Sequence, residues 1–92
     1  MIQSYKHARA ARLLANERVT ELVQIENQAR TRLIRLNAAE CLEDLAAIRG
    51  NRLEALKGDR KGQYGIRIND QYRICFQSEE KGPCNVEIVD YH

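Results

Sequence analysis

The chain lacks tryptophan, contains one proline and five glycines, and has only three cysteines among its 92 residues. Cys41, Cys75 and Cys84 form no CxxC pair, and one thiol would remain unpaired in any disulfide scheme. The sequence therefore supports neither a zinc site nor a disulfide framework. We expect the cysteines to behave as small hydrophobic side chains that are buried or half-buried.

Long apolar runs are also missing. Lys6, His7 and Arg9 interrupt the N-terminal residues before a secretion signal or a membrane span could form. We therefore expect a cytoplasmic protein with no membrane segment. A hydrophobic fraction of 43% and a charged fraction of 30% are typical of a globular protein with one modest core. The expected organisation is a single domain over residues 1–92.

The formal net charge of +2 says little about partners, but the charges are unevenly distributed. Lys and Arg outnumber Asp and Glu by 7 to 3 in residues 1–36 and again in residues 49–75, whereas residues 37–48 and 76–92 are acidic. A basic surface attracts phosphates through counterion release, whatever the total charge. The two basic segments are therefore candidates for contact with phosphate groups.

Helical periodicity dominates the first half of the chain. Residues 2–5 predict a short strand, and the Ala- and Arg-rich residues 6–15 suit a helix. Five apolar residues then recur at helical spacing and predict one buried stripe of a second helix, with Thr20 as its N-cap. The stripe consists of Leu22, Ile25, Ala29, Leu33 and Leu36.

Basic and capping residues surround that stripe. Off the stripe lie three arginines, Arg30, Arg32 and Arg35. They form either a solvated face or a contact with RNA or a partner protein. Asn37 followed by Glu40 resembles a capping box, which predicts a third, short helix that ends near Gly50.

The period then changes from helical to alternating, which predicts half-buried strands. The apolar rows are Tyr64, Ile66 and Ile68, then Tyr72, Ile74 and Phe76. A three-residue loop at residues 69–71 puts both rows on one face, with Arg67 opposite Arg73 on the other, whereas a two-residue loop would separate the rows. Two like charges in that position are costly without an anion nearby, so we expect a phosphate there.

A second turn at residues 80–83 leads into a strand around Val86 and Ile88. Helices first and a meander of strands afterwards predict an α+β fold of two layers. In it the N-terminal helices pack on a small, mainly antiparallel sheet.

The last three residues, Asp90, Tyr91 and His92, directly follow the final predicted strand. RNA cleavage without a metal needs a base for the 2′-hydroxyl proton, cations for the phosphoryl oxygens and an acid for the leaving 5′-oxygen. All these group types occur here beside Arg67 and Arg73, and Tyr91 offers a ring for stacking on a base. The terminal residues are therefore candidate catalytic groups.

The segment 56–62 combines two glycines with three cations, Lys57, Arg60 and Lys61. Such a loop is either a solvated turn or an open segment that approaches a phosphate backbone. We take Arg60, Lys61 and Arg67 as candidate RNA-binding residues. No lysine is followed by Ser or Thr, which disfavours a Walker-type nucleotide site.

Three separated motifs resemble HigB-type toxins of the RelE superfamily: RLEALKGDR at residues 52–60, QYRICF at residues 71–76 and the terminal DYH. The opening also matches the family pattern, with Met1, Ile2, Ser4, Tyr5 and Lys6. The resemblance covers essentially the whole chain. It implies a RelE-like fold and a toxin of a type II toxin–antitoxin system that inhibits translation and growth.

By this resemblance the activity is an endoribonuclease that enters the ribosomal A site and cleaves the exposed messenger RNA codon, with no metal and no cofactor. Lys57 and Arg73 resemble the family's cations at the scissile phosphate. Tyr91 resembles its terminal aromatic residue, His92 its proton-transfer group, and Asp90 the carboxylate that orients them. The implied partner is a HigA-like helix-turn-helix antitoxin, with the toxin alone a monomer and the complex a hetero-oligomer.

One residue departs from the family pattern. Glu54 stands where well-known members carry a histidine. The glutamate either acts as a base or merely forms an ion pair with Lys57. Two alternatives to the nuclease remain open, a non-catalytic module that binds RNA or the ribosome, and a protein that only binds its antitoxin.

Overall fold

The computed structural model describes residues 1–90, so the candidate residues Tyr91 and His92 lie outside the described part. Helical elements come first, followed by a four-stranded antiparallel sheet in the order β1-β2-β3-β4. The helical elements are α1 (Ala8–Leu14), η1 (Thr20–Ile25), α2 (Glu26–Ala38), α3 (Leu42–Ala46), η2 (Arg49–Asn51) and η3 (Gly58–Arg60). The strands are β1 (Glu54–Ala55), β2 (Gln63–Arg67), β3 (Tyr72–Glu79) and β4 (Gly82–Asp90). The predicted α+β fold is confirmed.

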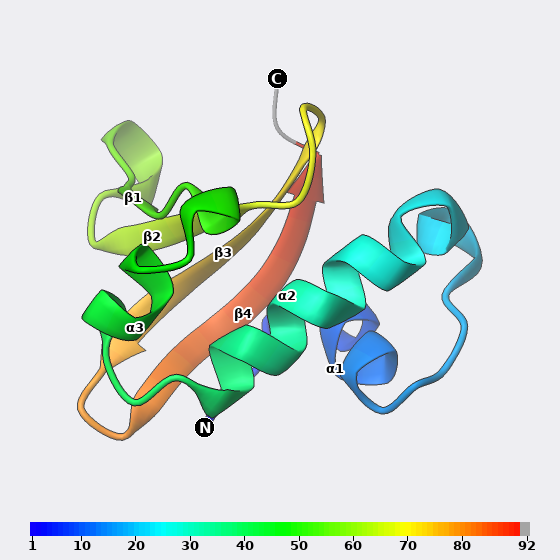
Figure 1. Ribbon diagram of the computed structural model, residues 1–92, viewed down its shortest axis with the longest axis horizontal. Helices are drawn as coiled ribbons and strands as arrows, with labels where there is room; N and C mark the ends of the chain where they lie inside the picture. The colour runs from blue at the N-terminus through cyan, green and yellow to red at the C-terminus, as the bar shows by residue number, and fades with distance from the viewer. Residues whose placement is uncertain (91–92) are drawn as a thin grey trace.

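The helix α2 lies across the sheet, and α1 packs against both α2 and β4 (Figure 1). The core forms between this helical layer and one face of the sheet. From the sheet it takes Ile66, Ile74, Phe76 and Ile88, all at most 2% exposed. The predicted helical stripe is also buried, with Leu22, Ile25, Ala29, Leu33 and Leu36 in the same cluster. Among residues 1–90, no helix combines the length and apolarity needed to cross a membrane.

The sequence predicts that the stripe is one helix capped by Thr20, but in the structure the stripe is divided between two elements. Its first part is the 3-10 segment η1, which is preceded by Val19 without any side-chain cap, so the Thr20 N-cap prediction is wrong. The α-helix begins only at Glu26. Three of the six residues of η1 are β-branched, which lowers their helix propensity, and short 3-10 turns are common at helix starts.

The predicted capping box is also wrong. Asn37 lies inside α2, and its Oδ1 accepts the Ile2 backbone N–H at 2.9 Å. The Glu40 backbone N–H instead donates to Asp44 Oδ2, also at 2.9 Å. The helix α3 ends at Ala46, and Gly50 lies within η2 rather than at a helix stop. A contact with the N-terminus, which sequence spacing does not reveal, therefore takes the Asn37 side chain away from the cap.

The hairpin between β2 and β3 has the predicted register. Arg67 pairs with Arg73 and Ile66 with Ile74, and the Ile68 backbone N–H donates to the Tyr72 carbonyl oxygen at 3.0 Å, which leaves residues 69–71 as the loop. The Asn69 side chain closes this loop by accepting the backbone N–H groups of Gln71 and Tyr72, each at 2.8 Å. The second turn is shorter than predicted, because β3 reaches Glu79 and β4 already begins at Gly82.

The N-terminal segment lies alongside β4, where Tyr5 forms a parallel bridge with Val86. The predicted strand at residues 2–5 is thus reduced to one bridge with flanking backbone hydrogen bonds, such as Val86 N–H to Ser4 O at 3.1 Å. Gly82 makes this approach possible. Its φ is +142°, and a Cβ atom there would clash with the Met1 carbonyl oxygen.

We expect Gly82→Ala to lower the free energy of unfolding by more than about 2 kcal/mol, because the substitution adds backbone strain and displaces the N-terminal segment. Gly58→Ala is the matched control, since Gly58 also has a positive φ but no atom within 4 Å of the added Cβ. It should cost only about 1 kcal/mol. Urea unfolding measures both values, and equal losses would contradict the proposed clash.

Candidate active site

The register across the sheet collects polar residues on the face that points away from the core. Glu54 lies opposite Gly65, Gly65 opposite Cys75, and Cys75 opposite Glu87. Arg67 is two residues from Gly65 on β2, and Arg73 is two residues from Cys75 on β3, so both arginines lie on the same face as these residues. We call this surface the polar face, defined by Glu54, Arg67, Arg73 and Glu87. The predicted placement of both arginines away from the core is confirmed.

Each of these two arginines has a carboxylate partner within the protein. Arg73 Nη1 lies 3.2 Å from Glu54 Oε1, and Arg67 Nη2 contacts Asp70 Oδ1. The arginine side chains are 22% and 26% exposed, so solvent and ligands still reach them. Two carboxylates of the protein itself therefore reduce the repulsion between Arg67 and Arg73, and the expected phosphate stays a prediction. Within residues 1–90, the ion pair of Glu54 joins Arg73 and not Lys57.

A buried glutamate, which the sequence analysis missed, anchors one end of the polar face. The Glu87 side chain is only 7% exposed, and its Oε2 lies 3.3 Å from Arg60 Nη1 and 3.5 Å from Lys6 Nζ. Arg60 Nη1 also donates to Gln63 Oε1 at 3.0 Å. The only sequence signal was an acid at an alternating position of the last strand, which by itself predicts an exposed residue.

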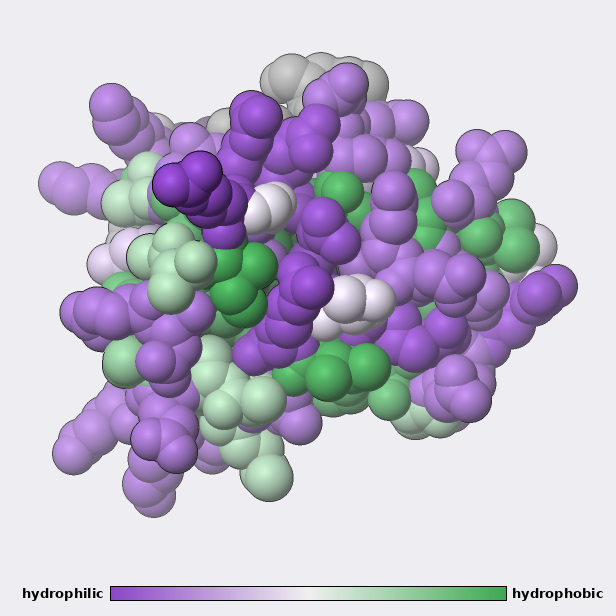
Figure 2. All heavy atoms as spheres, viewed as in Figure 1, coloured by the Kyte–Doolittle hydropathy of each residue, from purple (hydrophilic) through white to green (hydrophobic). Residues whose placement is uncertain are grey.

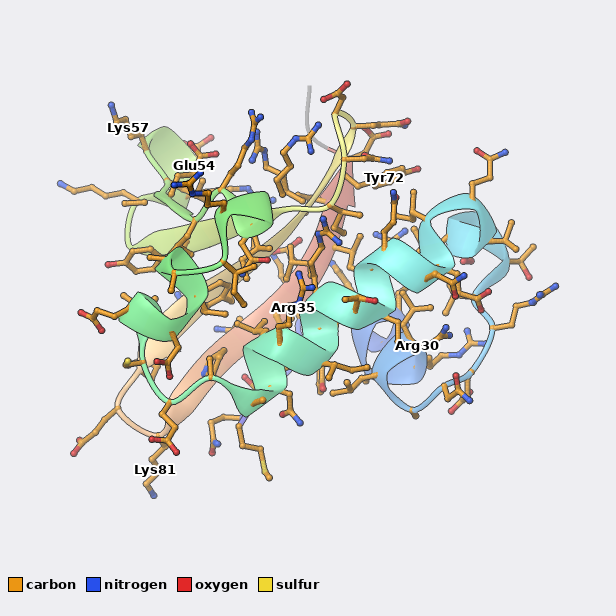
Figure 3. All side chains as sticks on the ribbon, in the orientation of Figure 1. Arg30, Arg35, Glu54, Lys57, Tyr72 and Lys81 are labelled. Atoms are coloured by element: carbon orange, nitrogen blue, oxygen red, sulfur yellow. The ribbon has the colours of Figure 1, made fainter. Side chains whose placement is uncertain are left out.

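The loop that carries the predicted cations is therefore only partly open. Arg60 is held by Glu87 and Gln63, whereas Lys57 and Lys61 are exposed. Figure 3 shows the Lys57 side chain extending away from the sheet close to Glu54. Residues 54–57 line a recess of about 270 Å³. The structure thus places Glu54, Arg67 and Arg73 together, with Lys57 at the rim of the recess beside Glu54.

Asp90 lies apart from the polar face. It pairs with Tyr72 at the end of β4, and the alternation puts its side chain on the face of Ile88 rather than on that of Arg73. The Gln71 side chain donates to Asp90 Oδ2 at 3.1 Å. The predicted neighbours Tyr91 and His92 lie outside the described residues. The described part of the site is therefore a set of cations paired with carboxylates, with Asp90 at the adjoining sheet end.

Cys75 is a nucleophilic side chain that lies buried beneath this face. It is 0% exposed, and burial raises the pKa of its thiol, so it stays protonated and out of reach of a substrate. Cys84 is half-buried, but Cys41 is exposed, so the expectation of burial is wrong for Cys41, which precedes α3 outside the core. No three His, Cys, Asp or Glu side chains of residues 1–90 are grouped so that they could hold a metal ion.

Two comparisons with known proteins give matches. A family model described as the RelE-like toxin of the type II toxin–antitoxin system HigB matches residues 3–92. A curated relative, toxin HigB-1 of Vibrio cholerae serotype O1, is 47% identical over 53 residues, which cover 58% of this chain and 56% of the relative. The matched segment thus spans little more than half of that relative.

We expect the Cys75 thiol to react with Ellman's reagent only after unfolding, because it is fully buried and its pKa is raised. The test variant, Cys41→Ser with Cys84→Ser, leaves Cys75 as the only thiol. It should show no fast labelling at pH 8 until guanidinium is added. The matched control, Cys75→Ser, keeps the exposed Cys41 and should react in the native state. Fast native labelling of the test variant would show that the polar face opens.

Proposed function

The chain belongs to the HigB-like family of RelE-like toxins, and we propose that it is an endoribonuclease that cleaves messenger RNA in the ribosomal A site. The observation that carries this proposal is the polar face, where Arg73 and Arg67 lie side by side and remain partly exposed. A row of two guanidinium groups matches the charge of a phosphodiester and of the transition state formed from it.

The proposed reaction is an internal transfer at phosphorus. The 2′-hydroxyl loses its proton and its oxygen attacks the adjacent phosphorus, while the bond from phosphorus to the 5′-oxygen breaks and that oxygen takes up a proton. The products are a 2′,3′-cyclic phosphate and a 5′-hydroxyl. In this scheme Arg73 stabilises the charge on the phosphoryl oxygens, and Lys57 binds the same phosphate from the recess beside Glu54.

Proton transfer is assigned by the resemblance to the family. We propose His92 as the main proton-transfer group, Tyr91 as the ring that stacks on a base, and Asp90 as the carboxylate that orients them. The described structure contributes Asp90 at the end of the sheet that also carries Arg73. Arg60, Lys61 and Arg67 are proposed to contact the RNA strand, with Lys61 the most exposed of the three and Arg60 first required to leave Glu87.

The proposed partners follow from the family. They are the ribosome with its messenger RNA, and a HigA-like helix-turn-helix antitoxin that forms a hetero-oligomer with the otherwise monomeric toxin. The proposed location is the cytoplasm, where translating ribosomes are found, and the proposed reaction uses neither a metal nor a cofactor. Purified protein incubated with messenger RNA, with and without translating ribosomes, tests this proposal through the mapped cut positions.

One observation favours a second candidate, a non-catalytic module that binds RNA, the ribosome or the antitoxin. The ion pair between Arg73 and Glu54 occupies the cation that cleavage requires. In a binding module this pair would stay closed. In a nuclease the phosphate must replace the Glu54 carboxylate on Arg73, an exchange that is feasible because a partly exposed ion pair contributes only about 0–1 kcal/mol.

We expect Arg73→Ala to lower the rate of ribosome-dependent cleavage by about 10²- to 10³-fold, the usual effect of removing one preorganised group that stabilises the transition state. Arg18→Ala, an exposed arginine between α1 and η1, is the control and should cleave at the parental rate. Circular dichroism establishes that both variants fold. Parental activity in the folded Arg73→Ala protein would remove Arg73 from the catalytic site, whereas absence of cleavage by the parent itself would favour the binding module.

We expect Glu54→His to cleave faster than the parent, by up to about 10²-fold, because an imidazole transfers protons near neutral pH and the substitution also releases Arg73. Glu54→Gln separates the two causes, since it releases Arg73 without adding a proton-transfer group. Single-turnover cleavage on ribosomes measures both variants. A rate for Glu54→His at or below that of the parent would remove the argument that the glutamate limits activity.

A further inference from the structure

The loop after β1 is anchored on the polar face at two points. We call residues 56–61, which include Lys57 and Lys61, the lysine loop. Its first anchor is Leu56, which is only 7% exposed although it lies outside the main core cluster. A Cβ on Gly65 would point to the polar face and come within 3.2 Å of Leu56 Cδ2. Leu56 therefore lies on the polar face, over the space that Gly65 leaves.

The second anchor of the lysine loop is Arg60. Its Nη1 donates to Gln63 Oε1 of β2 at 3.0 Å and lies 3.3 Å from Glu87 Oε2 of β4. Because β3 runs between these two strands, the guanidinium group lies across the middle of the sheet. The Cys75 thiol of β3 is close enough for the charges of Arg60 and Glu87 to act on it, although burial is the main cause of its raised pKa.

The Glu87 carboxylate makes this second anchor strong. The Glu87 side chain is 7% exposed, and a carboxylate removed from water requires a cationic partner. Arg60, at 31% exposed, is the closer and less solvated partner, whereas Lys6 lies 3.5 Å away and is 55% exposed. A buried ion pair usually adds little net stability compared with apolar side chains of similar volume. The pair between Glu87 and Arg60 is therefore better suited to fixing geometry than to stabilising the fold.

Lys57 lies between the two anchors, one residue after Leu56 and three before Arg60. The Arg60 backbone N–H donates to the Lys57 carbonyl oxygen at 3.2 Å, so a shift of Arg60 moves the backbone of Lys57 directly. Figure 2 shows hydrophilic side chains projecting at the corner of the molecule that holds β1 and η3, and Lys57 is exposed there. The position of this lysine therefore depends on the anchor at Glu87.

We propose that Glu87 is a positioning residue of the proposed ribonuclease, which holds the lysine loop through Arg60 and so sets where Lys57 meets the scissile phosphate. The inference rests on the proposed function and adds to it a residue that does not touch the substrate. In this role the pair between Arg60 and Glu87 stays closed when RNA binds. Direct contact of Arg60 with RNA requires the pair to open, so the two roles of Arg60 predict opposite effects of removing the Glu87 charge.

Single-turnover cleavage on ribosomes, over a range of protein concentrations, separates these two roles. We expect Glu87→Gln and Arg60→Gln each to lower the maximal rate by about 10- to 10²-fold, because misplacing a reacting group by about 1 Å has an effect of this size. The matched control is Glu80→Gln, which removes an exposed acid from the turn between β3 and β4 and should cleave at the parental rate. A maximal rate for Glu87→Gln at or above that of the parent would overturn the proposal in favour of direct contact of Arg60 with RNA.

A Lys57→Ala background distinguishes positioning from a general loss of structure. In that background Glu87→Gln should change the cleavage rate by less than about 2-fold, because the group that Glu87 positions is already absent. A loss as large as in the parental background would show that Glu87 acts on the whole fold, and would overturn the proposal.

Hydrogen exchange tests the anchor without RNA. In Glu87→Gln the hydrogen-bonded amides of Leu56, Arg60 and Lys61 should exchange at least about 10-fold faster than in the parent, while amides in the middle of β3 keep their rates. Unchanged exchange in the lysine loop would overturn the proposal, whatever the cleavage rates. Absence of cleavage by the parent would instead overturn the proposed function, and the exchange rates would still decide whether Glu87 holds the lysine loop.

Discussion

The register between β2 and β3 is the constraint on which the rest of the structure depends. Side chains alternate across a strand, so a slip by one residue would exchange the faces of Ile66 and Arg67 along with all of their neighbours. The observed pairing of Ile66 with Ile74 lets the core close under α2. The same pairing leaves Arg67 and Arg73 together on the opposite face. The same strand register therefore forms the core and assembles the candidate site.

The polar face is held in shape by carboxylates. Glu87 joins the N-terminal segment to the loop after β1 through Lys6 and Arg60, and is itself almost fully buried. Its two cationic partners are partly exposed, and removing one of them would leave a buried carboxylate less compensated, which favours keeping these contacts. Glu54 is more exposed and holds Arg73 more weakly. The face thus combines a buried carboxylate at Glu87 with a more exposed ion pair between Arg73 and Glu54, which suits the proposed exchange of Glu54 for a phosphate.

The arginines of the protein differ in whether a carboxylate balances their charge. On the polar face Arg67 and Arg73 each have an internal carboxylate, whereas Arg35, Arg49 and Arg52 have none within the described residues. An arginine that already pairs with a carboxylate of the protein binds an external anion only where that anion can replace the carboxylate. Cations without one favour a strong and salt-dependent attraction to any dense array of phosphates.

The sequence by itself determined the features that arise from local periodicity. The stripe from Leu22 to Leu36, the three-residue loop at 69–71 and the facing of Arg67 and Arg73 all follow from spacings of a few residues. Tertiary structure decided the partners of polar side chains. Asn37 accepts a hydrogen bond from Ile2, Glu54 pairs with Arg73, and Glu87 pairs with Lys6 and Arg60. These partners lie between 19 and 81 residues apart in the chain, where no periodic pattern reaches, and only the packed sheet brings them within hydrogen-bonding distance.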